Sequence, residues 1–205
     1  MSADNQQGSP LTPPWRGYDP SETTRRAPLK AYLLGALHDG TYNKLHKTFR
    51  ISQKGNDWLR KLQLILKRIG CKSWIYREGK DRDVYVLETT ASFLDMKFDP
   101  MKLKTNEEKI SYVRGYFDSE GGISHKLKDR FYIQFCQKNM EEMIKVRNIL
   151  GHSGIKCGKL HNPSKAVDPN YWRFYVKTES HSNFIGKVSS WHPRKYKIFD
   201  ERVEI

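Results

Sequence analysis

The sequence lacks the residue patterns of disulfide-bonded, zinc-binding and membrane-spanning proteins. Its three cysteines, Cys71, Cys136 and Cys157, are widely spaced and form no C-x-x-C pair, and its seven histidines show no H-x-x-x-H spacing. No apolar run approaches the roughly 18 residues of a spanning helix, and no N-terminal apolar stretch resembles a secretory signal. We therefore expect reduced thiols and a soluble, intracellular protein without a membrane partner.

Positive charge is abundant. The 205 residues contain 37 Lys and Arg against 23 Asp and Glu, which gives a formal net charge of +14. Residues 1–28 contain five of the nine prolines and equal numbers of basic and acidic residues, so we expect a flexible leader there. The whole net charge then falls on residues 29–205. A folded part of this charge favours a polyanionic partner, nucleic acid above all.

From residue 29 onward the chain passes twice through one order of predicted elements, which divides it into halves 29–104 and 105–205. In the first half we predict helices at 29–40, 57–70 and 91–98, and strands at 48–54 and within 74–88. In the second half we predict helices at 106–122, 140–151 and 182–191, and strands at 131–138, 156–164 and 171–179. The prediction is an α+β protein of two αββαββα halves.

The predicted strands alternate apolar and polar residues, so each sheet would turn one face to its helices and the other to solvent. Phe49 and Ile51 would face inward, and so would Val84 and Val86, with Leu87 outward. Two sheets side by side would form a saddle whose concave, basic face meets a DNA major groove. The residues that we expect to contact DNA are Arg50, Ser52, Arg77, Lys80, Arg82, Lys126, Lys128, Gln134, Lys159, Arg173, Tyr175 and Lys177.

Two acids, Asp39 and Glu120, end the apolar helices that open the two halves, and each is followed by glycine. A carboxylate at a helix C-terminus faces the negative end of the helix dipole, which is unfavourable unless a cation is bound. Mg²⁺ takes one or two protein carboxylates together with water and phosphate oxygens, and Mn²⁺ or Ca²⁺ can substitute for binding. Packing of these helices would bring both acids to one metal site. No nucleophile elbow, P-loop or Ser/His/Asp set offers another chemistry.

VRGYFDSEGG (113–122) resembles the LAGLIDADG motif, and YLLGALHDG (32–40) resembles a degenerate first copy. The resemblance covers about residues 29–197 and implies a monomeric, site-specific homing endonuclease in which metal-activated water cuts both DNA strands. It assigns the metal to Asp39 and Glu120 and a structural place at the helix interface to Asp118. Gly35 is separated from Asp39 by one residue fewer than the motif has, so the register of the first motif stays open.

The resemblance also implies catalytic roles for four further residues. Gln53 and Gln137 are similar to residues that order water near the scissile phosphate, and Lys102 and Lys195 to lysines that steady the attacking water or the developing charge. Each lysine is equally consistent with an ordinary solvated or phosphate-contacting charge. The lysines that would replace them in another register are Lys97, Lys104, Lys187 and Lys197.

Two other functions remain open on the same scaffold. An intron maturase would bind intron RNA with the same basic surface, and a DNA-binding regulator would bind DNA without cutting it. Retention of both acids favours cleavage over either. The sequence indicates neither the DNA target, nor the gene's setting in an intron or elsewhere, nor an organelle.

Overall fold

The computed structural model describes residues 26–124 and 129–203. Most of the predicted leader, residues 1–25, lies outside the described residues, as do the predicted DNA contacts Lys126 and Lys128. None of the described helices is long and apolar enough to cross a bilayer.

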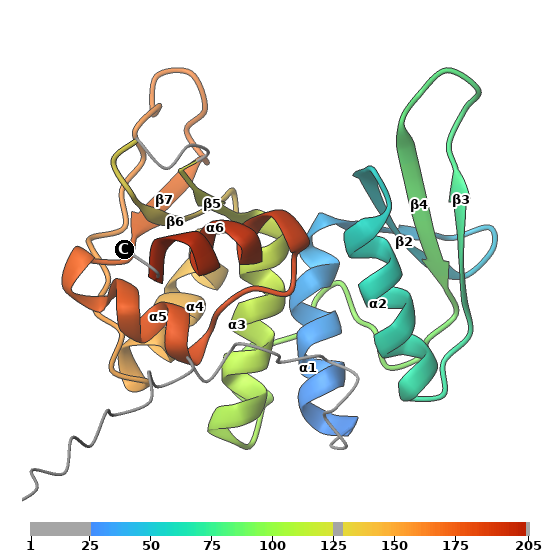
Figure 1. Ribbon diagram of the computed structural model, residues 1–205, viewed down its shortest axis with the longest axis horizontal. Helices are drawn as coiled ribbons and strands as arrows, with labels where there is room; N and C mark the ends of the chain where they lie inside the picture. The colour runs from blue at the N-terminus through green and yellow to red at the C-terminus, as the bar shows by residue number, and fades with distance from the viewer. Residues whose placement is uncertain (1–25, 125–128, 204–205) are drawn as a thin grey trace, which may run out of the picture.

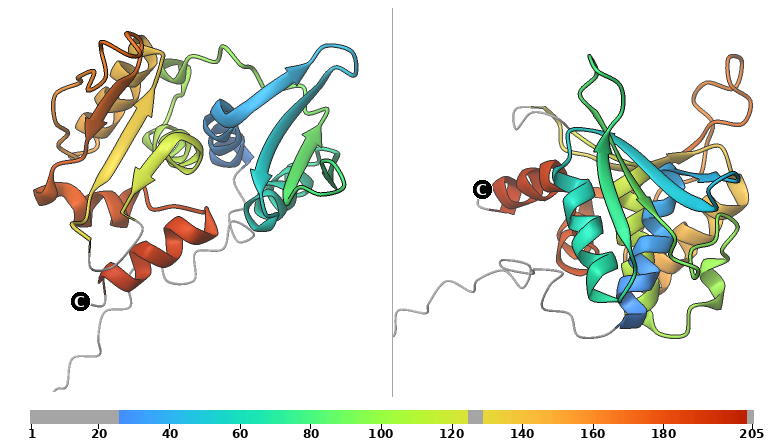
Figure 2. Two further views of the ribbon diagram at one scale, coloured as in Figure 1. Left: turned by 90° about the horizontal axis from the view of Figure 1, so that it is seen from above. Right: turned by 90° about the vertical axis from the view of Figure 1, so that its right-hand side faces the viewer.

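Two helices, α1 (Arg26–Ala36) and α3 (Asn106–Glu120), stand side by side in the centre of the molecule, with one sheet beyond each (Figures 1 and 2). The first half continues through η1 (Leu37–Asp39), β1 (Gly40–Asn43), β2 (Thr48–Lys54), α2 (Asp57–Arg68), β3 (Ser73–Arg77), β4 (Val84–Thr89) and η2 (Pro100–Lys102). The second continues through β5 (Gly121–Ile123), β6 (Ile133–Gln137), α4 (Met140–His152), β7 (Trp172–Tyr175), η3 (Thr178–Ser180), α5 (His181–Lys187) and α6 (Pro193–Val203).

Both sheets are antiparallel, with strand orders β1-β2-β4-β3 and β5-β6-β7. The α2 helix packs against the first sheet and α4 against the second, so each half buries one face of its sheet on helices. The opposite faces form the upper side of the molecule, from which the β3–β4 hairpin and the loop before β7 project (Figure 1). The predicted α+β class with two related halves and antiparallel sheets is confirmed.

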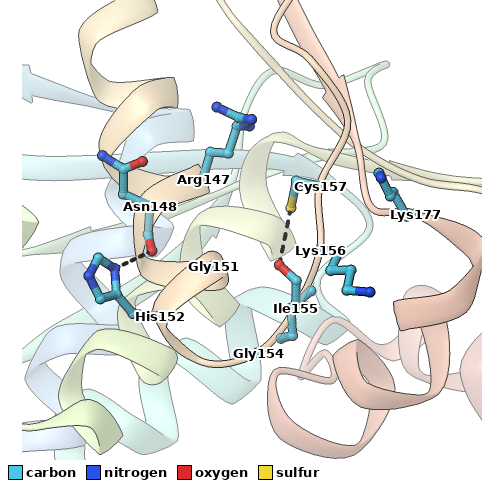
Figure 3. Close-up of a pocket in the computed structure, with 9 residues that line it drawn as sticks. All are labelled: Arg147, Asn148, Gly151, His152, Gly154, Ile155, Lys156, Cys157 and Lys177. Atoms are coloured by element: carbon cyan, nitrogen blue, oxygen red, sulfur yellow. Dashed lines mark hydrogen bonds between the residues drawn. The ribbon is translucent and has the colours of Figure 1, made fainter.

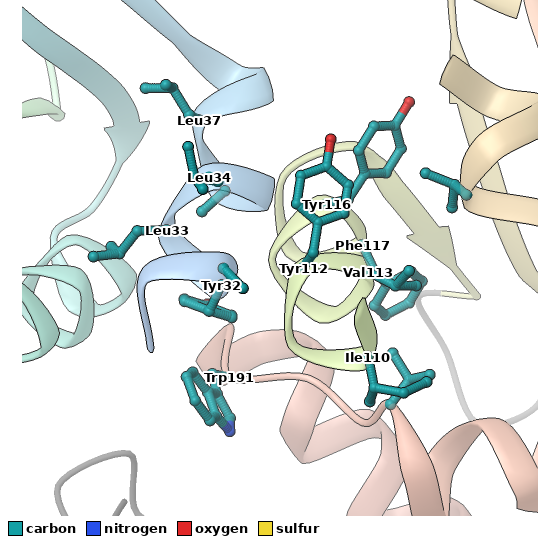
Figure 4. Close-up of a cluster of buried hydrophobic side chains, with 14 of the residues drawn as sticks. Tyr32, Leu33, Leu34, Leu37, Ile110, Tyr112, Val113, Tyr116, Phe117 and Trp191 are labelled. Atoms are coloured by element: carbon teal, nitrogen blue, oxygen red, sulfur yellow. The ribbon is translucent and has the colours of Figure 1, made fainter. Parts of the chain in front are cut away.

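Glycine allows the central helices to touch backbone to backbone. A Cβ on Gly35 would lie 2.0 Å from the Tyr112 carbonyl oxygen, and one on Gly115 would lie 2.0 Å from that of Tyr32. The reciprocity makes Gly35 and Gly115 equivalent members of one pseudo-symmetric contact. Around it the side chains of Tyr32, Tyr112 and neighbouring apolar residues are fully buried (Figure 4).

Most strands face as predicted. Phe49 and Ile51 lie in or against the core of the first half, as Phe135 and Phe174 do in the second. The facing predicted for β4 is wrong, because Ile51 pairs with Leu87, which puts Leu87 in the core and Val86 on the opposite face. Val86 is fully buried there, so burial on both faces of β4 removed the polar alternation on which the prediction depended.

Three further predictions are corrected by the structure. Residues 91–98 form turns in place of a helix, and 156–164 contribute only isolated bridges, Cys157 to Val176 and His161 to Arg173. The helix predicted at 182–191 ends at Lys187 as α5, and a further helix, α6, begins at Pro193. Proline fits there because the first turn needs no backbone N–H donor. The short strands β1 and β5 are too brief to show a pattern in sequence.

Candidate active site and nucleic-acid interface

Asp39 ends η1, which continues α1, and Glu120 ends α3. Directly after each acid, the chain enters the first strand of that half's sheet. Residue contacts across the helix pair make Ala36 the counterpart of Tyr116. From Tyr116 to Glu120 an α-helix rises about 6 Å over four residues. From Ala36 to Asp39 the chain is a 3₁₀ helix, which also rises about 6 Å, over three residues. The tighter last turn therefore compensates for the missing residue of the first motif.

Each acid is held by a glutamine from the second strand of its sheet. Gln53 Nε2 donates to Asp39 Oδ2, and Gln137 Nε2 donates to Glu120 Oε1 at 2.8 Å. The strand registers are equivalent, since Gly40 pairs with Ile51 and Gly121 with Phe135, two residues before each glutamine. The structure thus brings together four of the predicted site residues as two matching pairs.

The electrostatics of the pair favour a cation. Loss of hydration raises the pKa of Asp39 above its ordinary value. The pKa of Glu120 is also raised, first by burial and then by the negative charge of Asp39. Buried carboxylates whose ionised forms are destabilised in this way are stabilised when a divalent cation binds between or beside them.

Asp118 is fully buried and holds the two halves together. It accepts hydrogen bonds from the Tyr32 hydroxyl at 2.7 Å, from the Ser190 hydroxyl, and from the backbone N–H of Trp191 and His192 at 2.9 and 3.1 Å. Its donors come from α1 and from the segment before α6, so the carboxylate ties three parts of the chain at the helix interface. These hydrogen bonds occupy both of its oxygens, and the side chain is buried from solvent.

Lys195 lies beside the acids but has no proton to offer them. Its Nζ donates to the carbonyl oxygens of Phe117, Asp118 and Gly121 at 2.5, 2.9 and 2.7 Å. An ammonium group has three protons, so all are used at the C-terminus of α3. Burial lowers the pKa of Lys195 to about 8, although nearby Asp118 and Glu120 oppose the shift. The geometry is that of a helix cap whose charge lies near Glu120.

Lys102, the expected counterpart of Lys195, is not brought to the carboxylates. It is exposed in η2, just before the first turn of α3, whereas Glu120 is the last residue of that helix. The 15 residues of α3 separate the two ends by roughly 21 Å. Of the alternative lysines, Lys187 donates to Ser153 O and Lys197 pairs with Glu201, while Lys97 and Lys104 are exposed in the loops before α3.

The expected DNA contacts divide into sheet residues and loop residues. Arg50, Ser52, Gln134, Arg173 and Tyr175 are on the sheet faces turned away from the core. Arg77, Lys80 and Arg82 lie at or near the turn of the β3–β4 hairpin, where Arg77 Nε donates to Arg82 O at 2.8 Å. Lys159 is exposed in the loop between α4 and β7.

Lys177 follows β7 and lines a hollow of about 650 Å³ between the end of α4 and the loop at 154–157 (Figure 3). Arg147 and Lys156 supply further positive charge there, but Lys156 pairs with Glu179 at 3.3 Å. The hollow is lined by none of the residues that hold the two carboxylates.

Sequence reasoning missed Glu88. It is 7% exposed on the outer face of β4, where it accepts hydrogen bonds from the hydroxyls of Thr48 and Tyr76. Both donors stabilise the ionised form and lower its pKa. No sequence pattern marks this residue, because its partners come from two other strands, β2 and β3, and meet it only in the folded sheet.

The residues present fit a hard divalent cation. The structure supplies two carboxylates, and the described residues offer no group of three or more His, Cys, Asp or Glu side chains that would form a protein-only site. Mg²⁺ suits such an incomplete ligand set because it retains water and takes substrate phosphate oxygens.

Comparisons with known proteins agree with this geometry. Residues 27–95 match the family described as LAGLIDADG-like domain. Among solved structures, I-DmoI in complex with DNA and Mn superposes with a TM-score of 0.60 at 18% identity, covering 80% of this chain and 98% of that chain. I-DmoI with DNA and Ca gives 0.64 at 17% identity, covering 86% and 98%. A comparison with curated protein sequences finds no match.

Full-length DUF199/WhiA from Thermatoga maritima superposes equally well, with a TM-score of 0.64 at 18% identity over 91% of this chain and 63% of that chain. Similarity at these identities establishes a shared fold, which hosts more than one function. Residues 27–95 are therefore similar to the LAGLIDADG-like domain family, and the chain as a whole shares its fold with I-DmoI and WhiA.

Proposed function

We propose that this protein is a site-specific DNA endonuclease that cuts both strands of a long target by metal-dependent phosphodiester hydrolysis. The observation that carries the proposal is the pair of carboxylates at equal height on the paired helices, each fixed by an equivalent glutamine. A purely structural acid at a helix C-terminus needs no such matched partner. Cutting two antiparallel strands, by contrast, requires two equivalent sites.

In this proposal Asp39 and Glu120 hold Mg²⁺, and the halves 29–104 and 105–205 each address one strand. The bound metal would supply charge stabilisation at the phosphate and lower the pKa of water. Gln53 and Gln137 fix one oxygen of each carboxylate and leave the other directed to ligands. The I-DmoI structures with DNA and Mn, Ca or Mg support the choice of a divalent cation.

Lys195 acts in this scheme as a positioning residue. Its positive charge offsets the partial negative charge of the carbonyl oxygens at the end of α3. The unfavourable energy of placing Glu120 at that end of the helix is thereby reduced. Lys102 has no role at the carboxylates and is assigned to the solvated surface or to DNA phosphates.

The decisive experiment measures cleavage and binding separately. Glu120→Gln and Asp39→Asn should reduce double-strand cleavage in Mg²⁺ by at least a thousandfold while DNA affinity changes by less than about tenfold, because the carboxylates hold metal rather than DNA. Glu179→Gln, which alters an exposed acid on the flank, is the matched control and should cleave normally. Full cleavage by either site variant would refute the assignment.

Two other functions of the scaffold give different results in the same assays. A DNA-binding regulator would bind a preferred sequence but leave it intact in Mg²⁺, Mn²⁺ and Ca²⁺. A maturase would bind intron RNA more tightly than the matching DNA. Matched glutamine–carboxylate pairs favour the endonuclease over both, because binding alone does not require them.

A further inference from the structure

Two arginines, one on the outer face of each sheet, are held by tyrosine hydroxyls. Arg50 on β2 donates from Nη2 to the Tyr76 hydroxyl at 2.9 Å. Arg173 on β7 donates from Nη1 to the Tyr175 hydroxyl at 3.1 Å and from Nη2 to that of Tyr171 at 3.0 Å. Each half therefore has an arginine on its sheet that is hydrogen-bonded to tyrosine hydroxyls, although the tyrosines come from different places in the two halves.

The Nε atoms of both arginines are buried and have no hydrogen-bond partner within the described residues. An unpaired buried N–H is destabilising, so the contacts of the terminal nitrogens must hold each guanidinium in this orientation. The Nε edge of each guanidinium is buried, and the hydrogen bonds of both arginines are made by their terminal nitrogens. Arg77 on the same sheet behaves as an ordinary surface arginine, since its Nε donates to Arg82 O.

The direction of the hydrogen bonds fixes Arg50 further. The Tyr76 hydroxyl donates to Glu88 Oε2 at 3.0 Å, so its oxygen must accept from Arg50. The Thr48 hydroxyl donates to the other Glu88 oxygen, which holds the carboxylate in place. Arg50 Nη2 also pairs with Glu78 Oε1 at 3.4 Å, so the guanidinium is held by Tyr76 and by Glu78.

Arg173 is fixed by its two rings instead. Its guanidinium lies 5.4 Å from the ring centroid of Tyr171 and 5.9 Å from that of Tyr175, within the range of cation–π attraction. Both residues therefore present a planar donor end in one orientation.

A phosphate contact requires only a positive charge, whereas a locked planar pair of donors suits a planar pair of acceptors. In the major groove guanine alone presents two acceptors, O6 and N7, while adenine presents a donor beside N7. We propose that Arg50 and Arg173 each read a guanine, one in each half of the DNA target, and that Tyr76 and Glu88 are positioning residues for Arg50. The inference rests on the proposed function in requiring the concave sheet faces to bind duplex DNA.

The test begins with selection of bound duplexes from a randomised DNA library by the full chain in Ca²⁺. The selected site should contain a guanine whose preference is lost in Arg50→Lys and a second one lost in Arg173→Lys, each by on the order of tenfold to a hundredfold. Replacing the first guanine by 7-deazaguanine should weaken the wild-type chain and leave Arg50→Lys unaffected.

Three further variants separate positioning from charge. Tyr76→Phe and Glu88→Gln should relax preference at the same base pair as Arg50→Lys while the salt dependence of binding stays unchanged, because no phosphate contact is lost. Arg68→Lys, which changes an exposed arginine of the α2 helix behind the same sheet, is the control and should change no base preference. Melting temperatures of all variants show whether any effect is a folding defect.

The outcomes distinguish the inference from the proposed function. If Arg50→Lys and Arg173→Lys weaken all sequences alike, both arginines are phosphate anchors and the inference is wrong, while DNA binding stands. If the wild-type chain selects no duplex, the proposed function fails as well. A selected site without arginine-dependent guanines overturns the inference alone.

Discussion

Replacing either central glycine by alanine should separate the helices that carry the two acids. A Cβ on Gly115 would lie 2.0 Å from Tyr32 O and 2.8 Å from Ala36 N, whereas an ordinary contact begins near 3.4 Å. The obstructing atoms belong to backbone and cannot rotate away, so the helices must part by more than an ångström. Overpacking typically costs about 1–3 kcal/mol, and we expect about 3 kcal/mol here because no side chain can relieve it.

Gly151 provides the matched control. It lies near the end of α4, and an added Cβ there would meet no atom within 4 Å. Gly151→Ala should therefore stabilise the protein by about 0.5–1 kcal/mol, since alanine loses less backbone entropy in a helix. Alanine should thus lower the free energy of unfolding at Gly115 and raise it at Gly151. Gly35→Ala should lower it, as Gly115→Ala does.

Urea unfolding followed by tryptophan fluorescence measures these free energies, and thermal unfolding should show a fall of roughly 6–12 °C for Gly115→Ala. Cleavage should fall as well, because parting the helices separates Asp39 from Glu120. If the free energy of unfolding of Gly115→Ala is within about 0.5 kcal/mol of the wild-type value, the close backbone contact between α1 and α3 is not what holds the halves together.

Three further outcomes follow from single contacts. Tyr32→Phe should cost about 2–3 kcal/mol in urea unfolding, because it removes one of the donors to Asp118 and leaves the Trp58 indole N–H without its acceptor, and an unchanged midpoint would contradict that network. Thr105→Ala should cost about 1 kcal/mol by removing the capping box of α3, and a loss below 0.3 kcal/mol would argue against it. Burial raises the pKa of the Cys157 thiol to about 11, so alkylation at pH 8, followed by mass spectrometry, should be on the order of a hundredfold slower than in the urea-unfolded chain, and equal rates would refute this.

The sequence was sufficient for features that depend on local pattern. The strand at Thr48–Lys54 was predicted to the residue because polar and apolar side chains alternate there and its inward residues contact helices. The two helices that end in Asp39 and Glu120 were expected to pack together, and the structure places Gly35 and Gly115 at their contact. These features need no knowledge of distant partners.

The sequence was insufficient where a local signal has two meanings. The resemblance to the LAGLIDADG family suggested equivalent lysines at Lys102 and Lys195, each two residues after a proline. Proline in that pattern marks only the start of a helix, and the two helices begin in different places. Only Lys195 reaches the carbonyls at the end of α3, since that depends on how α6 crosses the helix pair.

The missing residue in the first motif shows how two halves in one chain can diverge without losing a shared geometry. A pair of equivalent sites requires the acids at equal height, and a 3₁₀ turn before Asp39 provides the same rise as the longer α-helical turn before Glu120. The supports are otherwise unequal, because Lys195 and the segment bound to Asp118 brace only the end of α3. Selection for function would act on the positions of the acids and their glutamines, which are the parts the two halves have kept in common.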